Sequence, residues 1–274
     1  MPDEPDAGSP GTFIARGREA AVYDLGDGTV LKVFDGPMAR PGAEREAAAL
    51  AALAELGIAA PRLVDVRTVD GLPSIAMTRV AGTDWLSRLG RRPQEATVVG
   101  RWLAIAHARV HESRAPDGLE TVRDQIAGRL GRSTVLDAHQ RARALALLGS
   151  LRDGSALLHG DFHLENLLGP LGAPTVIDWV NASSGPPAAD VARTDVILRF
   201  GELPDGAPRL VRAIAPLARS AILRRYLVTY RRRCPGALED FDAWRTVHAT
   251  ARMGETTETE AAAIRAWLAR QPSP

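Results

Sequence analysis

The chain has 274 residues, of which 45% are hydrophobic and 24% charged, a composition typical of a globular protein with a sizeable core. Its net charge of +1 gives no support for a protein that binds nucleic acid or a membrane surface. One cysteine, Cys234, excludes an intramolecular disulfide, and neither a signal peptide nor a run of about 18 apolar residues is present, so we expect a cytoplasmic protein.

The first part of the chain is predicted to form a small sheet with one helix. Residues 1–10 are acidic and proline-rich and are expected to be a disordered tail. A helix over 41–56 begins at Pro41 and ends before Gly57. Five short β-favouring runs, separated by turn residues, predict strands over 12–16, 20–25, 29–34, 62–69 and 73–80.

After Gly82 the pattern changes to mostly helical. We therefore expect two lobes, residues 11–82 and residues 83–274. Two β-like stretches, 156–162 and 174–180, interrupt the helices of the second lobe. The helices are predicted over 94–113, 119–130, 137–152, 188–200, 217–233 and 240–268, the last with breaks.

The densest polar cluster is HGDFHLENLL, residues 159–168, followed by VIDWV at 176–180. Asp161, Asn166 and Asp178 offer hard oxygen atoms in apolar surroundings, as Mg²⁺ prefers. The H-x-D-x-x-x-x-N spacing is that of a phosphoryl-transfer loop, in which the Asp accepts the proton of the attacking hydroxyl and the Asn binds metal. The competing interpretation is a polar loop that only satisfies backbone groups.

Lys32 is the only lysine, beside 33 arginines, and it lies on the third predicted strand. In phosphoryl-transfer enzymes with the loop above, a lysine on that strand contacts the α- and β-phosphates and is held by a helix glutamate. Glu46 shares a helical face with Leu50 and Leu53 and is predicted to point inward toward Lys32. Otherwise Glu46 is a solvated helix residue.

With these residues, the chain resembles the aminoglycoside phosphotransferase family, small-molecule kinases with a protein-kinase-like fold, from about residue 11 to 200. LLHGDFHLENLL is similar to the family's catalytic loop, and VIDWVNASSGPPAADVART to its metal-binding segment. The resemblance implies an α+β, two-lobed fold, with a small antiparallel-sheet lobe that binds nucleotide and a larger helical lobe that carries the catalytic loop and the acceptor site.

The resemblance also implies a nucleotide site at IAMTRVAG, residues 75–82, which is similar to the hinge between lobes. There the backbone of Thr78 and Val80 would receive the adenine edge, with Met77 behind it; a plain edge strand followed by a turn fits the same pattern. RGREAAVYDL, residues 16–25, resembles the hairpin over the nucleotide but lacks the G-x-G-x-x-G of protein kinases.

Four further residues are expected to have structural roles. Asp190 would brace the catalytic loop, and His159 would tether it through a backbone hydrogen bond. Trp179 and His111 would serve packing.

The predicted activity is therefore ATP- or GTP-dependent phosphorylation of a small-molecule hydroxyl, with Mg²⁺ on Asn166 and Asp178 and Asp161 as the catalytic base. The protein would act as a monomer or homodimer. A metallohydrolase is a remoter alternative, since His107 and His111 are four apart on a helix but lack the H-E-x-x-H glutamate. A pseudokinase would lack one of these residues, and a protein kinase would need a longer activation loop.

The acceptor follows least clearly from the sequence. Over residues 180–274, fourteen arginines face ten acids, which disfavours a strongly cationic acceptor such as an aminoglycoside. A neutral or mildly charged acceptor is at least equally consistent with the sequence, whether a non-aminoglycoside antibiotic or a metabolite such as a sugar, an amino alcohol or a nucleoside-like compound.

Overall fold

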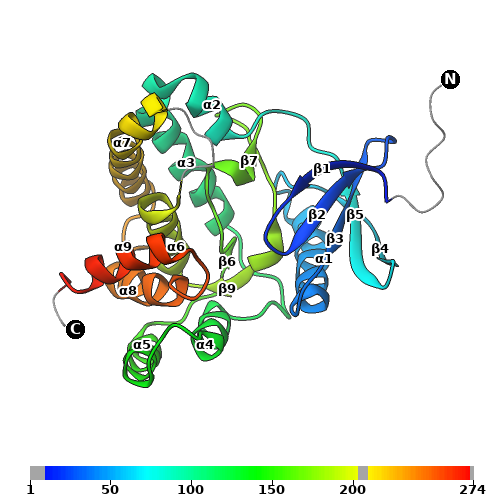
Figure 1. The fold of residues 1–274 in the computed structure, drawn as a ribbon. Coiled ribbons are helices and arrows are strands. Elements are labelled where there is room, and N and C mark those ends of the chain that lie inside the picture. The colour runs from blue at the N-terminus through cyan, green and yellow to red at the C-terminus, as the bar shows by residue number, and fades with distance from the viewer. Residues whose placement is uncertain (1–9, 203–208, 272–274) are drawn as a thin grey trace.

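The computed structural model describes residues 10–202 and 209–271. Five antiparallel strands form one sheet in the order β1-β2-β3-β5-β4, and a mainly helical part lies beside it (Figure 1). This is the expected α+β, kinase-like arrangement, although the expected tail at 1–10 lies almost wholly outside the described residues. The strands are β1 (Thr12–Arg16), β2 (Ala20–Asp24), β3 (Thr29–Phe34), β4 (Leu63–Val69) and β5 (Leu72–Thr78).

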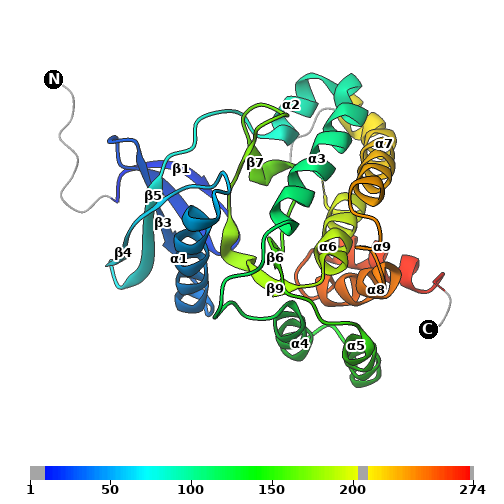
Figure 2. The same ribbon diagram turned by 180° about the vertical axis from the view of Figure 1, so that it is seen from behind.

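Helix α1 (Ala39–Leu56) packs on one face of this sheet, as Figure 2 shows from behind. Alternation along β3 turns Val30 and Phe34 toward the core that α1 covers, whereas Leu31 and Val33 belong to a small cluster on the other face. Lys32 shares the α1 face. The helix begins two residues before the predicted start, because Pro41 is tolerated in a first turn, and it ends at Gly57 with φ +67°.

The remaining helices largely follow the predicted order, with two corrections to the predicted elements. Helix α2 was not predicted; it has only seven residues, and Asp84 caps it by accepting from Ser87 N at 2.7 Å. Helix α7 continues through Pro216, where the sequence suggested a start at 217. The helical stretch 240–268, predicted with breaks, forms two helices. Their bounds are α2 (Trp85–Arg91), α3 (Ala96–His111), α4 (Val122–Arg132), α5 (Ala138–Ser150), α6 (Pro187–Phe200), α7 (Arg209–Arg233), α8 (Phe241–Arg252) and α9 (Glu258–Leu268).

The predicted β-like stretches 156–162 and 174–180 form much shorter strands, because most of their residues belong to the loops that follow. These strands pair as β6 with β9 and β7 with β8, between the large sheet and the helices (Figure 1). A hydrogen bond from Ile177 N to Asn166 O, 3.0 Å long, joins the two loops. The strands are β6 (Ala156–Leu158), β7 (Leu167–Leu168), β8 (Thr175–Val176) and β9 (Ser183–Gly185).

One hydrophobic core continues from the sheet into the helices, and its fully buried side chains include Phe34, Trp85, Trp179 and Tyr226. Helices α3 and α7 approach most closely at Gly100. A Cβ on Gly100 would lie 2.5 Å from the Ile222 carbonyl oxygen, so only glycine fits without separating the helices.

None of the described helices combines the length and the apolar character that a membrane span requires.

We predict that Gly100→Ala lowers the free energy of unfolding by about 1–3 kcal/mol, because the added methyl group overpacks the α3–α7 contact. The matched control is Gly131→Ala in α4, where no atom lies within 4 Å of an added Cβ. That control should gain about 0.5–1 kcal/mol from helix propensity. Urea unfolding of both variants measures the difference, and equal stability of the two would contradict the packing account.

Candidate active site

Lys32 lies between two carboxylates that come from different parts of the chain. Its Nζ donates to Glu46 Oε2 at 2.7 Å and to Asp178 Oδ1 at 2.8 Å. The side chains of Lys32 and Glu46 are 11% and 1% exposed, and that of Asp178 is 38% exposed. The Lys32–Glu46 contact is the one expected from the helix phase, and Glu44, on the opposite face, is exposed.

The two carboxylates determine the charge of Lys32. Burial alone would lower the lysine pKa, but Glu46 and Asp178 raise it above its usual value, so the ammonium stays protonated. Two carboxylates therefore share one ammonium. Burial raises the pKa of Glu46, and the charge of Lys32 opposes this rise.

The loop at residues 159–168 is held by Asp190, which lies in the first turn of α6. Its carboxylate accepts from His159 N at 2.6 Å and from Gly160 N at 2.9 Å. His159 Nε2 donates to the Ile177 carbonyl at 3.0 Å, as the tether predicted from the sequence. Gly160 has φ +77°, and an added Cβ would lie 2.4 Å from the Asn181 carbonyl oxygen, so glycine is required here.

Two histidines of α3 complete the environment of Asp190. The Nε2 atoms of His107 and His111 lie 3.0 and 3.2 Å from Asp190 Oδ2. Their Nδ1 atoms accept from the hydroxyls of Tyr226 and Tyr230 at 2.7 and 2.6 Å. Burial lowers the pKa of His107 to about 3, so this ring is neutral.

These three residues could hold a metal by geometry, since their ligand atoms lie within 4.8 Å of one another. However, Asp190 already accepts two backbone N–H groups, and His107 and Asp190 have no exposed side-chain surface. A catalytic metal needs an open coordination position. The geometry therefore favours the structural brace over the metallohydrolase alternative. Trp179 is likewise fully buried, with Nε1 donating to the Val176 carbonyl.

Asp161, the predicted base, is 23% exposed and lies between two cationic groups. His163 Nε2 is 3.3 Å from Asp161 Oδ2, and Arg193 Nη2 is 3.8 Å from Oδ1. Burial alone would raise the pKa of Asp161, but His163 and Arg193 hold it well below its usual range. The carboxylate is therefore ionised at neutral pH.

Asn166 and Asp178, the predicted metal ligands, are brought near each other by the bond between Ile177 N and Asn166 O. Asn166 Nδ2 donates to the Asp161 carbonyl at 3.0 Å, which leaves Asn166 Oδ1 for another partner. Asp178 has φ +65° and ψ +65°, a left-handed conformation that is uncommon for a residue with a side chain and concentrated at functional sites.

The predicted hinge residues lie at the end of β5. Met77 is buried, and Thr78 and Val80 are partly buried. Thr78 N donates to the Arg62 carbonyl at 2.9 Å, so only its carbonyl is left for an adenine. A role for these three residues in nucleotide binding remains a prediction.

Sequence reasoning gave no role to a cluster of three arginines and one acid, of which Arg193 lies 3.8 Å from Asp161 Oδ1. They are Arg45, Arg129, Arg193 and Glu255, which come from α1, α4, α6 and the segment between α8 and α9. Among 33 arginines nothing in the sequence singles them out. Only the packing of these elements around the catalytic loop does so.

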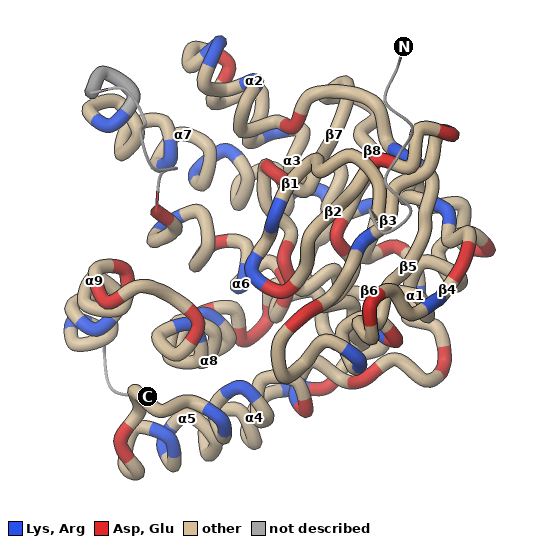
Figure 3. Tube along the Cα trace, turned by 45° about the vertical axis from the view of Figure 1, so that its right-hand side comes forward, with Lys and Arg blue, Asp and Glu red and all other residues tan. Residues whose placement is uncertain are grey.

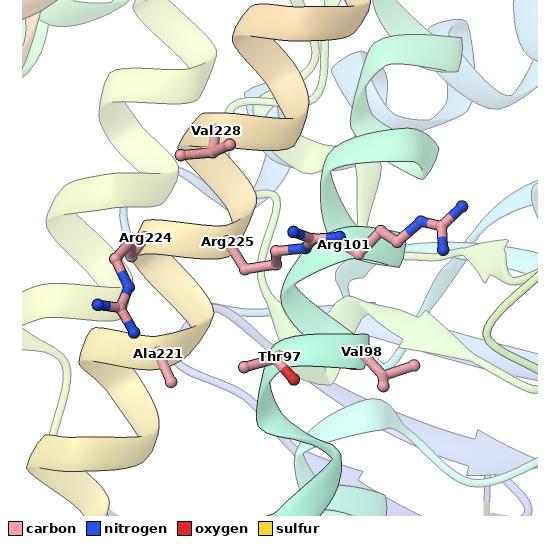
Figure 4. A pocket seen from close by; sticks show the side chains of 7 residues that line it. All are labelled: Thr97, Val98, Arg101, Ala221, Arg224, Arg225 and Val228. Atoms are coloured by element: carbon pink, nitrogen blue, oxygen red, sulfur yellow. The ribbon is translucent and has the colours of Figure 1, made fainter.

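A separate groove of about 530 Å³ lies between α3 and α7 (Figure 4). It contains none of the predicted site residues. Its walls are formed by Thr97, Val98, Arg101, Ala221, Arg224, Arg225 and Val228.

The sequence pattern of the phosphotransferase enzyme family matches residues 10–235. The chain belongs to this family. It is therefore a phosphotransferase, as the resemblance implied. No curated protein matches the chain.

Solved structures confirm the fold. The amicoumacin kinase hAmiN, in complex with AMP-PNP, Ca²⁺ and Ami, is 15% identical with a TM-score of 0.62, covering 95% of this chain and 87% of that one. An aminoglycoside-3'-phosphotransferase of type VIII is 21% identical with a TM-score of 0.61, covering 89% and 94%. The macrolide 2'-phosphotransferase type I is 18% identical with a TM-score of 0.52, covering 95% and 91%.

We predict that Lys32→Arg lowers kcat/KM for ADP formation by about 10²-fold, equivalent to about 2.7 kcal/mol. A planar guanidinium would take a bidentate grip on Glu46 or Asp178 and fill the space in which a compact ammonium can face a third partner. Steady-state kinetics measure the loss, and circular dichroism checks that the variant is folded.

The matched control is Arg224→Lys, the reverse exchange at an exposed position of α7. It should behave as the unchanged protein. Full activity of Lys32→Arg would mean that the single lysine is an accident of composition.

Proposed function

We propose that this phosphotransferase moves the γ-phosphoryl group of ATP to a hydroxyl group of a small molecule. The observation that carries the proposal is the meeting of Lys32, Glu46 and Asp178 beside the loop of Asp161 and Asn166. Phosphoryl transfer depends mainly on positioning and electrostatic stabilisation, and this arrangement offers a fixed cation, a base and oxygen ligands. The AMP-PNP bound to the similar amicoumacin kinase supports ATP as donor.

The donor set fits Mg²⁺ by its chemistry. Asp178 is a carboxylate that is 38% exposed, Asn166 has a side-chain oxygen left for another partner, and Lys32 shares its one ammonium between two carboxylates. Mg²⁺ favours a site with one or two carboxylates that leaves room for phosphate oxygens. When bound on Asn166 and Asp178, it would neutralise charge on the phosphates.

In the proposed step the acceptor oxygen forms a bond to the γ-phosphorus, and the bond from that phosphorus to the β–γ bridging oxygen breaks. ADP leaves with that electron pair, and Asp161 takes the acceptor's proton. Because the pKa of Asp161 is low, it is a weak base and accepts the proton once bond formation has made the hydroxyl acidic. Lys32 would contact the α- and β-phosphates while Glu46 holds it in place.

The nucleotide is proposed to lie against residues 11–82, with the Thr78 carbonyl and Val80 N–H on the adenine edge and Met77 behind it. Residues 83–274 would supply the catalytic loop and the acceptor site. Only residues 179–186 separate Asp178 from α6, which leaves no space for the long activation loop of a protein kinase. This supports a small acceptor.

The acceptor is proposed to be an antibiotic or a metabolite. The similarity to the amicoumacin, aminoglycoside and macrolide enzymes supports an antibiotic. The arginines beside Asp161 favour the second candidate, a metabolite kinase. Release of ADP from ATP, or of GDP from GTP, measured across a library of hydroxyl compounds tests the function. No stimulation by any compound would count against it.

We predict that Asp161→Ala lowers acceptor-stimulated ADP release by about 10²–10⁴-fold, the usual contribution of a positioned base. Binding of AMP-PNP with Mg²⁺, measured by calorimetry, should change little because other groups hold the nucleotide. Near-normal turnover of this variant would show that another residue is the base.

We predict a different defect for Asp178→Ala, because Asp178 is proposed to hold the metal. Its affinity for AMP-PNP in Mg²⁺ should fall clearly, whereas its affinity in EDTA should match that of the unchanged protein. Calorimetry under both conditions separates metal binding from general damage. An equal loss in EDTA and in Mg²⁺ would contradict the metal role.

A further inference from the structure

Three arginines converge beside the catalytic loop from three different helices. Arg193 of α6 is 5% exposed, with Nη1 2.9 Å from Glu255 Oε2 and Nη2 3.8 Å from Asp161 Oδ1. Arg129 of α4 is 16% exposed; its Nη2 donates to Asn181 Oδ1 at 2.8 Å, and its Nε lies 3.5 Å from Glu255 Oε1. Arg45 of α1 donates from Nε to the Val180 carbonyl at 3.2 Å.

This cluster has more positive than negative charge. Its contacts provide two carboxylates, Glu255 and Asp161, for three guanidinium groups, and Asp161 is also the proposed acceptor of the substrate's proton. Burial lowers the pKa of Arg129, and the neighbouring charges of Arg193 and Arg45 lower it further, while Glu255 and Asp161 oppose them. Bringing like charges together in a partly buried place is unfavourable unless an anion joins them.

Buried polar atoms nearby support the same conclusion. Among the described residues near the cluster, Arg193 Nε, Glu255 Oε1 and both ring nitrogens of His248 are buried without a hydrogen-bond partner. Burial lowers the pKa of His248 to about 3, and the charges of Arg193 and Arg129 act in the same direction. His248 is therefore neutral and adds no charge, but the field around it is positive.

A purely structural ion pair in the same part of the molecule looks different. Arg252 of α8 pairs one-to-one with Glu260 of α9, both buried, and Thr256 donates to the same carboxylate. That pair is balanced and needs no further ligand. Arg129 and Arg193, by contrast, share Glu255, Arg193 also faces Asp161, and Arg45 donates to the Val180 carbonyl.

We propose that Arg45 and Arg129, backed by Arg193, bind an anionic group of the acceptor, a carboxylate or a phosphate. The proposal rests on the proposed function. Arg193 is already engaged by Glu255 and Asp161, so the donors for the ligand come from the two more exposed arginines. Arg45 lies on α1, which packs on the sheet, and Arg129 lies on α4 in the helical part. A bound anion would therefore connect these two parts of the molecule.

The arginine cluster shows where positive charge could act against a cationic acceptor, which the count of charges over residues 180–274 could not show. Eight of the fourteen arginines counted over residues 180–274 belong to α7, part of them visible as blue segments in Figure 3, and six of these are exposed. The cluster, in contrast, reaches Asp161 through Arg193. A polycationic acceptor would place ammonium groups against guanidinium groups there.

The first test compares acceptors in which one hydroxymethyl group becomes a carboxylate or one hydroxyl becomes an ammonium group: glucose with glucuronate and glucosamine, and glycerol with glycerate and aminopropanediol. ADP release with ATP and Mg²⁺ should give a kcat/KM at least about tenfold higher for the acid than for the amine of a set, the effect of one charge-assisted contact. The inference is overturned if the amine of a set has a kcat/KM equal to or higher than that of the acid, or if kanamycin is turned over efficiently. Either result would leave the proposed function intact. Absence of ADP release with every compound counts instead against the function.

The second test needs no turnover. With the nucleotide site saturated by AMP-PNP and Mg²⁺, inorganic phosphate should raise the melting temperature of the protein. Arg129→Gln and, separately, Arg45→Gln should abolish this rise, and Arg129→Lys should retain part of it. Arg224→Gln, at an exposed position of α7, is the matched control and should respond as the unchanged protein does. No rise in the unchanged protein, or an undiminished rise in both Gln variants, overturns the inference.

Discussion

The ammonium of Lys32 between Glu46 and Asp178 is the interaction on which the site depends. It joins the central strand β3 to the helix α1 and to the segment after β8. Glu46 and Asp178 are 14 and 146 residues away from Lys32 in the sequence. Both oxygen–nitrogen distances are those of strong charge-assisted hydrogen bonds. Because the sheet and the helical part meet at this ammonium, its position fixes where a triphosphate and the catalytic loop can face each other.

A second constraint fixes the loop itself. Asp190 holds the N–H groups of His159 and Gly160, and its own position is set by two histidines of α3 that two tyrosines of α7 orient in turn. The tight approach of α3 to α7 at Gly100 therefore matters for the loop as well as for the fold. Asp161 does not need to contact α3 or α7, because Asp190 links these helices to the backbone of the loop that carries Asp161.

The sequence predicted those features that depend on local pattern and on chemically unusual residues. The sheet with its helix and the pairing of Lys32 with Glu46 follow from strand alternation, helix phase and loop spacing, whereas the brace from Asp190 was implied by the family resemblance. It did not predict α2, because seven residues are too few to show a helical pattern of apolar residues. It also did not predict that α7 passes through Pro216, which packing stabilises. It missed Arg45, Arg129 and Arg193, because their meeting depends on tertiary packing; their roles, like those of the other site residues, remain proposals.

The most direct measurement of the central claim is a crystal structure with AMP-PNP and Mg²⁺. The account predicts that Lys32 Nζ keeps Glu46 and comes within about 2.7–3.2 Å of a phosphate oxygen. Asp178 should exchange its bond to Lys32 for the metal, with Asn166 Oδ1 as a second ligand. A nucleotide bound elsewhere, or one whose phosphates stay out of hydrogen-bond reach of Lys32 while the Lys32–Asp178 pair persists, would contradict it.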